Sequence, residues 1–364
     1  MEPTVRAKLH DAYWRFAAER QRVFNRRAQG QPGPWTEDPI LRRYKFCNAF
    51  RASDRVSQYL IANVIYAEGA EELPSEDIFL RIILFRLFSK ETTWQVLEEA
   101  TGGVCRATLD ITHLGDVLAD VRARQSIYTA AFILCAHDTY GMGAKHRNHL
   151  RLVEEMFRPG RLGRLLARAR SLKEVYEALR GWPTIGAFMG YQLAVDLNYS
   201  DRLGFSEDEF TVPGPGAVRG LQKVFSDFGG QTPEQLIMRM VDVQHEQFER
   251  LGLDWSGLFG RPLHAIDCQG LFCETDKYAR VAFPELKSNR VRIKQEFRDP
   301  KPAMALFYPP KWDINERVGS ESRTPGADLP EGQLSFDPLP QRIARVATVS
   351  ATSRRSRPRA RSAA

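Results

Sequence analysis

Residues 264–286 (HAIDCQGLFCETDKYARVAFPEL) combine acidic side chains with a lysine at spacings that could carry chemistry. On a helix, at about 100° per residue, Asp267 and Glu274 lie within about 40° of each other, with Lys277 on the adjoining stripe. Two carboxylates one or two turns apart, with a lysine nearby, can take a proton from an amine nucleophile or orient a leaving phosphate. A salt-bridged helix surface is the alternative for the same pattern.

A second polar face is predicted within residues 43–61 (RYKFCNAFRASDRVSQYLI). A helix from about residue 51 would place four polar side chains together, namely Arg51, Asp54, Arg55 and Gln58. Two arginines beside a carboxylate and an amide can bind phosphate, because the acid holds the guanidinium planes in position. The alternative is that Asp54 only caps the helix and pairs with a surface arginine.

Two glycine-containing turns are candidates for contact with a phosphate backbone. In residues 179–200 a helix is expected to end near Arg180, with a tight turn to Gly186 and a new helix after it, which is a helix-hairpin-helix-like pattern. In residues 208–225 the run PGPG places Gly214 and Gly216 at a helix start, where backbone amides can bind an anion. An ordinary helical corner and a plain turn are the respective alternatives.

Other kinds of site have little support in the sequence. The pattern GxxxxGK[ST] is absent, which argues against an autonomous P-loop nucleotide kinase. No metal site is predicted, because Cys268 and Cys273 do not share a helix face and His146 with His149 lacks a third ligand. No Gly-x-Ser-x-Gly motif or cysteine beside an activating histidine indicates a nucleophilic enzyme.

The elements that position these residues are predicted to be helices. Apolar residues in 5–27 follow helical spacing, and Gly30 to Pro34 then ends the pattern. Ser171 with Glu174, and Thr232 with Gln235, have the spacing of capping boxes at two further helix starts. Helical periodicity also occurs in 54–68, 76–100, 113–136, 146–157 and 215–228, while strand-like alternation is scarce. We therefore expect an all-α protein.

Composition changes along the chain indicate its organisation. We expect a helical body over residues 1–300, in one unit or in two lobes meeting near 158–163, where RPGRLGR interrupts the helices. Residues 301–320 form an extension, and residues from Met304 to Tyr308 have apolar side chains that can pack back on the body. Residues 321–364 are predicted to be a disordered basic tail, suited either to non-specific phosphate binding or to solubility.

The charge and the cysteines bear on location. The net charge is +7, but five arginines in the last fourteen residues leave only +2 for residues 1–350. Five scattered cysteines are more typical of reduced thiols than of a disulfide framework. We expect no membrane span and no signal peptide, and hence a cytoplasmic protein of a bacterial or phage-infected cell.

Four blocks of sequence, in order, resemble a known family: NAFRASDRVSQYLI, WPTIGAFMGYQLAVDLNY, VPGPGAVRGLQKVF and IDCQGLFCETDKY. The family is that of the α-glutamyl/putrescinyl-thymine pyrophosphorylases, whose helical domain also carries the name of the DNA 5-hydroxymethyluracil kinase. The resemblance covers roughly residues 10–300. It implies a fold similar to helix-hairpin-helix DNA glycosylases and a reaction that replaces pyrophosphate on 5-pyrophosphomethyluracil in DNA with an amine or amino acid.

The resemblance also implies roles for particular residues. It places Arg51, Asp54 and Arg55 near phosphates and Gly186 at the DNA backbone. It assigns the reactive cluster to four residues of the block at 264–286: Asp267, Glu274, Asp276 and Lys277. The implied partners are DNA and an amine or amino-acid co-substrate, and a separate DNA kinase is a further candidate partner. Magnesium is compatible with departing pyrophosphate, although no ligand set can be named.

Two alternative functions remain open. One is a glycosylase-like repair enzyme using Asp208 or Asp196, although Ser206 occupies the spacing at which hairpin glycosylases place their catalytic aspartate. The other is a non-catalytic DNA-binding module that recognises modified thymine or assists a separate 5-hydroxymethyluracil DNA kinase.

Overall fold

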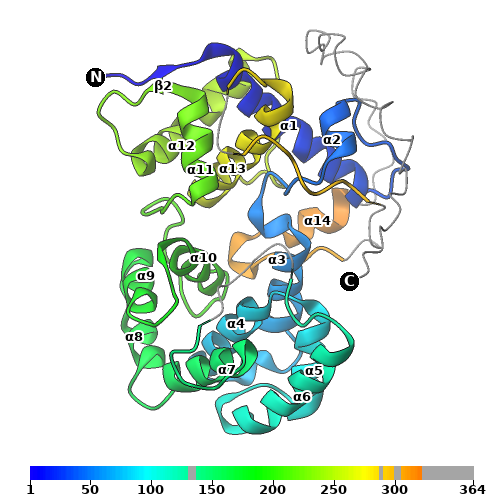
Figure 1. The fold of residues 1–364 in the computed structure, drawn as a ribbon. Coiled ribbons are helices and arrows are strands. Elements are labelled where there is room, and N and C mark those ends of the chain that lie inside the picture. The colour runs from blue at the N-terminus through cyan, green and yellow to red at the C-terminus, as the bar shows by residue number, and fades with distance from the viewer. Residues whose placement is uncertain (130–136, 287–289, 299–304, 322–364) are drawn as a thin grey trace, which may run out of the picture. The chain divides into compact units, whose positions relative to one another are not determined.

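The computed structural model describes residues 1–129, 137–286, 290–298 and 305–321, and all of them belong to one compact unit. Their secondary structure is almost entirely helical, which confirms the all-α prediction (Figure 1). The helices are α1 (Ala7–Ala28), α2 (Pro39–Arg43), α3 (Arg55–Leu60), α4 (Ser75–Phe88), α5 (Glu91–Thr101), α6 (Ile111–Arg124), α7 (Lys145–Met156), α8 (Leu162–Arg168), α9 (Leu172–Arg180), α10 (Ala187–Leu197), α11 (Pro215–Val224), α12 (Pro233–Arg250), α13 (Ala265–Ala282) and α14 (Asn315–Glu321).

Short elements complete the chain. The one-turn helices are η1 (Arg51–Ser53), η2 (Ile61–Ile65), η3 (Ala70–Glu72), η4 (Arg106–Thr108) and η5 (Pro310–Trp312). Two strands, β1 (Thr4–Val5) and β2 (Phe225–Asp227), pair antiparallel. Of the basic tail predicted over residues 321–364, Glu321 is the last residue of α14, and residues 322–364 lie outside the described residues. The end of the periodic segment 113–136, at 130–136, also lies outside them.

Capping chemistry sets two of the helix starts as predicted. At α12 the Thr232 side chain accepts from the Gln235 N–H, and the Gln235 side chain accepts from the Thr232 N–H, which completes the capping box. At α9 the Ser171 hydroxyl accepts from the Glu174 N–H, but the Glu174 carboxylate accepts from Arg170 instead of Ser171. Half of that predicted box is therefore present.

The helices fall into two sets of close neighbours. The first set contains α1, α2, α11, α12 and α13 with both strands, and α13 contacts each of the other four helices in it. The second set runs continuously from α3 to α10, and α4 contacts α5, α7, α8 and α10. The segment η1 contacts both α3 and α13, so it joins the two sets. The predicted lobe boundary at 158–163 falls between α7 and α8, inside the second set, and the division into domains stays a prediction.

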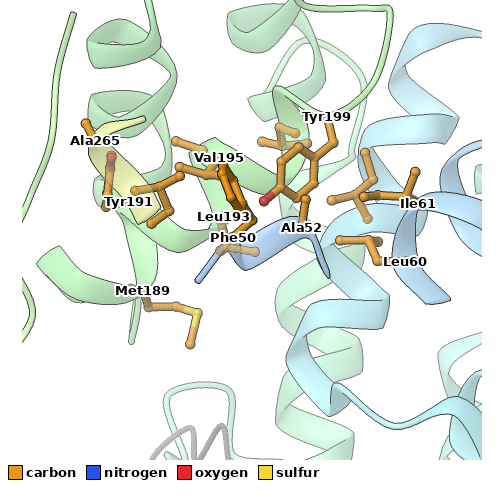
Figure 2. Close-up of a cluster of buried hydrophobic side chains, with 14 of the residues drawn as sticks. Phe50, Ala52, Leu60, Ile61, Met189, Tyr191, Leu193, Val195, Tyr199 and Ala265 are labelled. Carbon is orange, nitrogen blue, oxygen red and sulfur yellow. The ribbon is translucent and has the colours of Figure 1, made fainter. Parts of the chain in front are cut away.

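Apolar packing fixes the position of η1 (Figure 2). Phe50 and Ala52, which flank Arg51, are buried among side chains of α10 such as Leu193 and Val195. Tyr199, just after α10, lies in the same cluster. Each large side chain buried in this way contributes roughly 1.5–3 kcal/mol relative to exposure. Arg51 is therefore held between two residues of the core.

The C-terminal extension packs on the body, as the apolar residues near Tyr308 predicted. The Tyr308 ring is fully buried and its hydroxyl lies 2.9 Å from the Ser53 hydroxyl. The Phe307 N–H donates to the Gln58 side chain over 2.9 Å. Met304, the first residue of the predicted contact, lies outside the described residues. Within the described ranges, none of the helices has both the length and the apolar character that crossing a membrane requires.

Candidate functional site

The side of α13 that the sequence singled out faces the segment before α3. Asp267, Gly270, Glu274 and Lys277 follow one another along this side, called here the acid–base stripe. The opposite side of the helix is core, since Cys268, Phe272 and Ala279 are fully buried. The predicted geometry of the helix is confirmed, while the roles of its residues stay predictions.

Glu274 is held at its place by two contacts to one oxygen. Its Oε2 accepts from the Cys47 N–H over 3.0 Å and lies 2.6 Å from the Lys277 Nζ. The Lys277 ammonium in turn lies 4.6 Å from the centre of the Phe46 ring. The other oxygen, Oε1, has no hydrogen-bond partner among the described residues. Glu274 therefore keeps one acceptor available beside a positive charge.

Asp267 occupies the other end of the stripe. Its Oδ1 accepts from the Arg51 N–H over 2.8 Å, and its Oδ2 accepts from the His264 N–H over 3.2 Å. Burial raises the pKa of Asp267 to about 6, so this carboxyl changes protonation state near neutral pH. Between the two acids, nothing lies within 4 Å of the position that a Cβ on Gly270 would take. The stripe thus has open space flanked by two carboxylates.

The junction between η1 and α3 adds a further acid, Asp54. The Asp54 Oδ1 accepts from the Asn48 N–H over 2.9 Å. Burial, helped by the nearby charge of Glu274, raises the pKa of Asp54 to about 6. The charges of Asp54 and Glu274 raise the pKa of the exposed Cys47 thiol well above its ordinary range. Cys47 therefore stays protonated and is a poor nucleophile at neutral pH.

Arg51 connects the two helix sets. Its backbone N–H binds Asp267 on α13, while its guanidinium binds the Gln192 side chain at 2.9 Å and Asp196 at 2.8 Å on α10. Asp196 is completely buried and also accepts two hydrogen bonds from Arg86. Burial alone would lower the pKa of Arg51, but Asp196 reverses the effect and raises it. The Arg51 side chain is thus engaged by protein groups.

The shared polar face predicted for residues 51–58 is wrong. A helical turn covers only Arg51–Ser53, and the extended backbone of Asp54 (ψ 141°) interrupts the helix before α3 begins. Arg55 then pairs with Glu91 at 2.8 Å. Gln58 is buried, donating to the Ala52 carbonyl and accepting from Phe307. These side chains do not lie together to bind one phosphate, because the break in the helix directs each of them to a different partner.

Asp276 lies away from the stripe. It is completely buried, and three cations surround its carboxylate: Arg219 at 3.2 Å, Lys223 at 3.0 Å and Arg280 at 2.6 Å. Although burial opposes it, hydrogen bonds from these cations lower the pKa of Asp276. Its geometry suits a structural ion cluster better than the reactive role predicted for it.

The predicted turn at Gly186 is present. The chain leaves α9, passes Thr184 at φ +68° and enters α10 with Gly186 as the N-cap. Gly186 is exposed, with open space where a Cβ would lie. The corner is therefore accessible to a large partner, although its assignment to the helix-hairpin-helix class stays a prediction.

The other two glycines serve packing. A Cβ on Gly214 would lie 2.6 Å from the Phe188 ring, and one on Gly216 would lie 2.3 Å from the Cys273 sulfur. Their missing side chains let the start of α11 approach α10 and α13. An open anion cradle, as expected from the sequence, does not match this crowding.

Sequence reasoning missed a pair at the start of α13. The Asp208 Oδ2 lies 2.6 Å from the His264 Nδ1, and its Oδ1 accepts from the Ala265 N–H over 2.8 Å. Burial opposes protonation of His264, but the bond to Asp208 outweighs it and raises the histidine pKa. The pair could not be seen in the sequence, because Asp208 lies 56 residues from His264. Only the position of His264 at a helix start was evident.

Other features of the described residues lie apart from the stripe. An open hollow of about 420 Å³ between residues 209–211 and α12 contains none of the stripe residues. In the part of the chain that the structure describes, no three histidine, cysteine or acidic side chains are grouped so that they could hold a metal.

The fold and site define a class: an all-α protein with a carboxylate–lysine stripe where two sets of helices meet. The helical domain of 5-hmdU DNA kinases matches residues 7–288 of this sequence. The chain therefore belongs to this family, in agreement with the resemblance found in the sequence.

A curated relative is the 5-hmdU DNA kinase of Bacillus phage SP10. It is 27% identical over 299 residues, which cover 76% of this chain and 46% of the relative. The chain thus spans less than half the length of that kinase. No solved structure matches this protein.

Proposed function

We propose that this protein modifies thymine-derived bases in DNA, exchanging a pyrophosphate on the 5-methylene carbon of uracil for an amine or amino acid. The observation that carries the proposal is the open space at Gly270, flanked by Asp267 and Glu274, in a member of a DNA kinase helical-domain family. DNA and the amine are its proposed partners.

The stripe has suitable groups for this exchange. A C–N bond forms at the methylene carbon while the C–O bond breaks, and pyrophosphate leaves with the electron pair. The attacking amine loses its proton to the Oε1 of Glu274, which has no partner among the described residues. The Lys277 ammonium, 2.6 Å from the same carboxylate, attracts the leaving pyrophosphate.

The exposed Gly186 corner offers a way to hold the DNA. The first N–H groups of α10 and the positive end of its dipole favour a backbone phosphate there. Chemistry on a base also requires the base to leave the stack, and a grip on the neighbouring backbone stabilises that state.

Nucleoside mass spectrometry tests the proposal. The protein is incubated with an amine mixture and an oligonucleotide containing 5-hydroxymethyluracil, with or without prior pyrophosphorylation. We expect a new aminomethyl nucleoside and released pyrophosphate only from the pyrophosphorylated DNA. No mass change together with no preferential binding would remove the proposal.

Glu274→Gln makes the test specific to the stripe. Because the amide cannot accept the amine proton, we expect turnover to fall by about 100- to 10,000-fold while DNA binding persists. Glu249→Gln, an exposed change on α12, is the matched control and should behave as wild type. Equal loss in both variants would argue against a role for the stripe.

A second candidate is a module that binds the modified base for a separate DNA kinase. It is favoured by the partial coverage of the SP10 kinase and by the missing GxxxxGK[ST] pattern in this sequence. Binding without turnover, unchanged in Glu274→Gln, would support this candidate. The glycosylase alternative is less favoured, because Asp196 and Asp208 are both engaged by other groups, and formation of abasic sites would revive it.

A further inference from the structure

A concentration of positive charge lies apart from the stripe, on the segment that contains α8, α9 and the turns beside them. Residues 158–180 carry seven arginine and lysine side chains and two acids, a net charge of +5. Residues 1–350 together carry only +2, so the other residues of that range are net acidic. Such an uneven distribution gives one part of a protein surface a positive potential, which attracts polyanions.

Three of these arginines share one side of α8. At about 100° per residue, Arg164 and Arg168 lie within about 40° of each other, with Arg161 about 20° further round the helix. All three residues are exposed, while Leu162 and Leu166 on the opposite side are fully buried. Burial of that opposite side fixes the direction in which the three arginines, called here the arginine row, point.

The charge of the row is not neutralised by the protein itself. Neither Arg164 nor Arg168 forms an ion pair with a described residue. Arg161 lies 3.1 Å from the Glu155 carboxylate, but the same carboxylate also pairs with two more arginines, at 2.8 Å and 3.0 Å. One acid shared by three cations leaves a positive excess, and exposed guanidinium groups remain able to donate hydrogen bonds to phosphate.

The row adjoins the Gly186 corner. The helix α8 packs on α9, which packs on α10 (Figure 1). The guanidinium carbon of Arg161 lies 5.8 Å from the centre of the Trp182 ring, inside the turn between α9 and α10. Arg180 donates to the Ile185 carbonyl over 3.1 Å, so a further guanidinium lies at the turn itself. A partner that contacts the corner therefore meets these cations next.

We propose that the arginine row binds backbone phosphates of duplex DNA next to the target base, and so extends the contact with DNA that begins at the Gly186 corner. Arg164 and Arg168 lie about 6 Å apart along α8, which suits a series of phosphates better than a single anion. A duplex presents one negative charge per about 1.7 Å of its length. The inference rests on the proposed function for DNA as the partner.

The salt dependence of DNA binding tests the row. Fluorescence anisotropy gives the affinity of the full-length protein for a duplex containing 5-hydroxymethyluracil over a series of NaCl concentrations. Each phosphate contact contributes about 0.9 to the slope of log K against log salt concentration. We expect Arg164→Gln/Arg168→Gln to bind about 10- to 100-fold more weakly at low salt, with a slope smaller by about 2. A slope equal to that of wild type would overturn the proposal.

The matched control is Arg122→Gln/Arg124→Gln on α6. These two arginines are also exposed, and neither forms an ion pair with a described residue. The control should keep the affinity and the slope of wild type. The unmodified duplex should lose as much affinity for the row variant as the modified one, because phosphate contacts carry no sequence information. Loss confined to modified DNA, or an equal loss in the control, would contradict the proposal.

Chemical protection of the wild-type protein covers the case in which the row variant fails to fold. Phenylglyoxal modifies accessible arginines, and peptide mass spectrometry locates the modified positions. We expect duplex DNA to protect Arg164 and Arg168 and to leave Arg122 reactive. Reactive Arg164 and Arg168 in a saturated complex would overturn the proposal. Protection by phosphatidylserine vesicles but not by DNA would also overturn it, since the row would then belong to a membrane-binding surface.

The results separate this inference from the proposed function. A smaller slope in the row variant, with no exchanged nucleoside formed by the wild-type protein, would remove the proposed exchange alone. Exchange by the wild-type protein, with an unchanged slope in the row variant, would remove the role of the arginine row alone.

Discussion

Glu274 and Asp276 lie two residues apart on α13 and have opposite surroundings. Asp276 is completely buried with three cations, whereas Glu274 has one lysine, one backbone donor and one unused oxygen. A carboxylate surrounded by cations of its own protein stabilises the fold. A carboxylate with a spare acceptor next to open space can meet a ligand. The difference separates two acids that the sequence alone made equivalent.

The largest change in the free energy of unfolding is expected from Asp276→Asn. Loss of the charge leaves three buried or half-buried cations without their counter-ion, which we expect to lower the free energy of unfolding by about 3–5 kcal/mol. Urea denaturation measures the change. Glu274→Gln should lose only about 1–2 kcal/mol, because it breaks one ion pair and its amide oxygen can still accept from the Cys47 N–H. Equal stability losses in the two variants would contradict the proposed difference between Asp276 and Glu274.

Gly220 and Gly270 form a second pair of positions with opposite surroundings, one crowded and one open. A Cβ on Gly220 of α11 would lie 2.0 Å from the Phe272 carbonyl oxygen, so Gly220→Ala should destabilise by about 1–3 kcal/mol through overpacking. Gly270→Ala should instead stabilise by about 0.5–1 kcal/mol, since alanine is the better helix former and the space is open. The added methyl group should still weaken binding of the modified base. Calorimetry and anisotropy together check the opposite signs.

A further effect of about the same size concerns the pH dependence of stability. Burial, with help from Glu274, raises the pKa of Asp54 from 3.8 to about 6, so the folded protein holds this proton more tightly than the unfolded chain. The contribution to stability is therefore present near pH 4 and is lost as pH rises through about 6. Asp54→Asn should remove this loss and gain about 1 kcal/mol over wild type between pH 4 and 7, allowing for solvent. A constant difference between the two proteins across this range would contradict the pKa shift.

Local sequence patterns predicted the helices and the stripe because both depend on near neighbours. Thr232 and Gln235 are three residues apart, and Asp267 and Glu274 are seven apart, so helical geometry alone relates them. The break before Arg55 could not be predicted in the same way. It depends on Arg51 bonding residues of α10 that lie more than 140 positions later in the chain. The Asp208–His264 pair could not be predicted for the same reason, since only tertiary packing brings its two residues together.

The contacts of the N-terminal segment with α13 and β2 have a consequence for synthesis on the ribosome. The Tyr13 hydroxyl donates to the Cys268 carbonyl, 255 residues later, and β1 pairs with β2. The amphipathic first helix therefore emerges long before its permanent neighbours are translated. The segment from α3 to α10 is contiguous and can collapse as it leaves the exit tunnel, because these helices pack mainly against one another. Nascent chains stalled before α13 should consequently expose an unsatisfied α1 to chaperones, with the middle of the protein already folded.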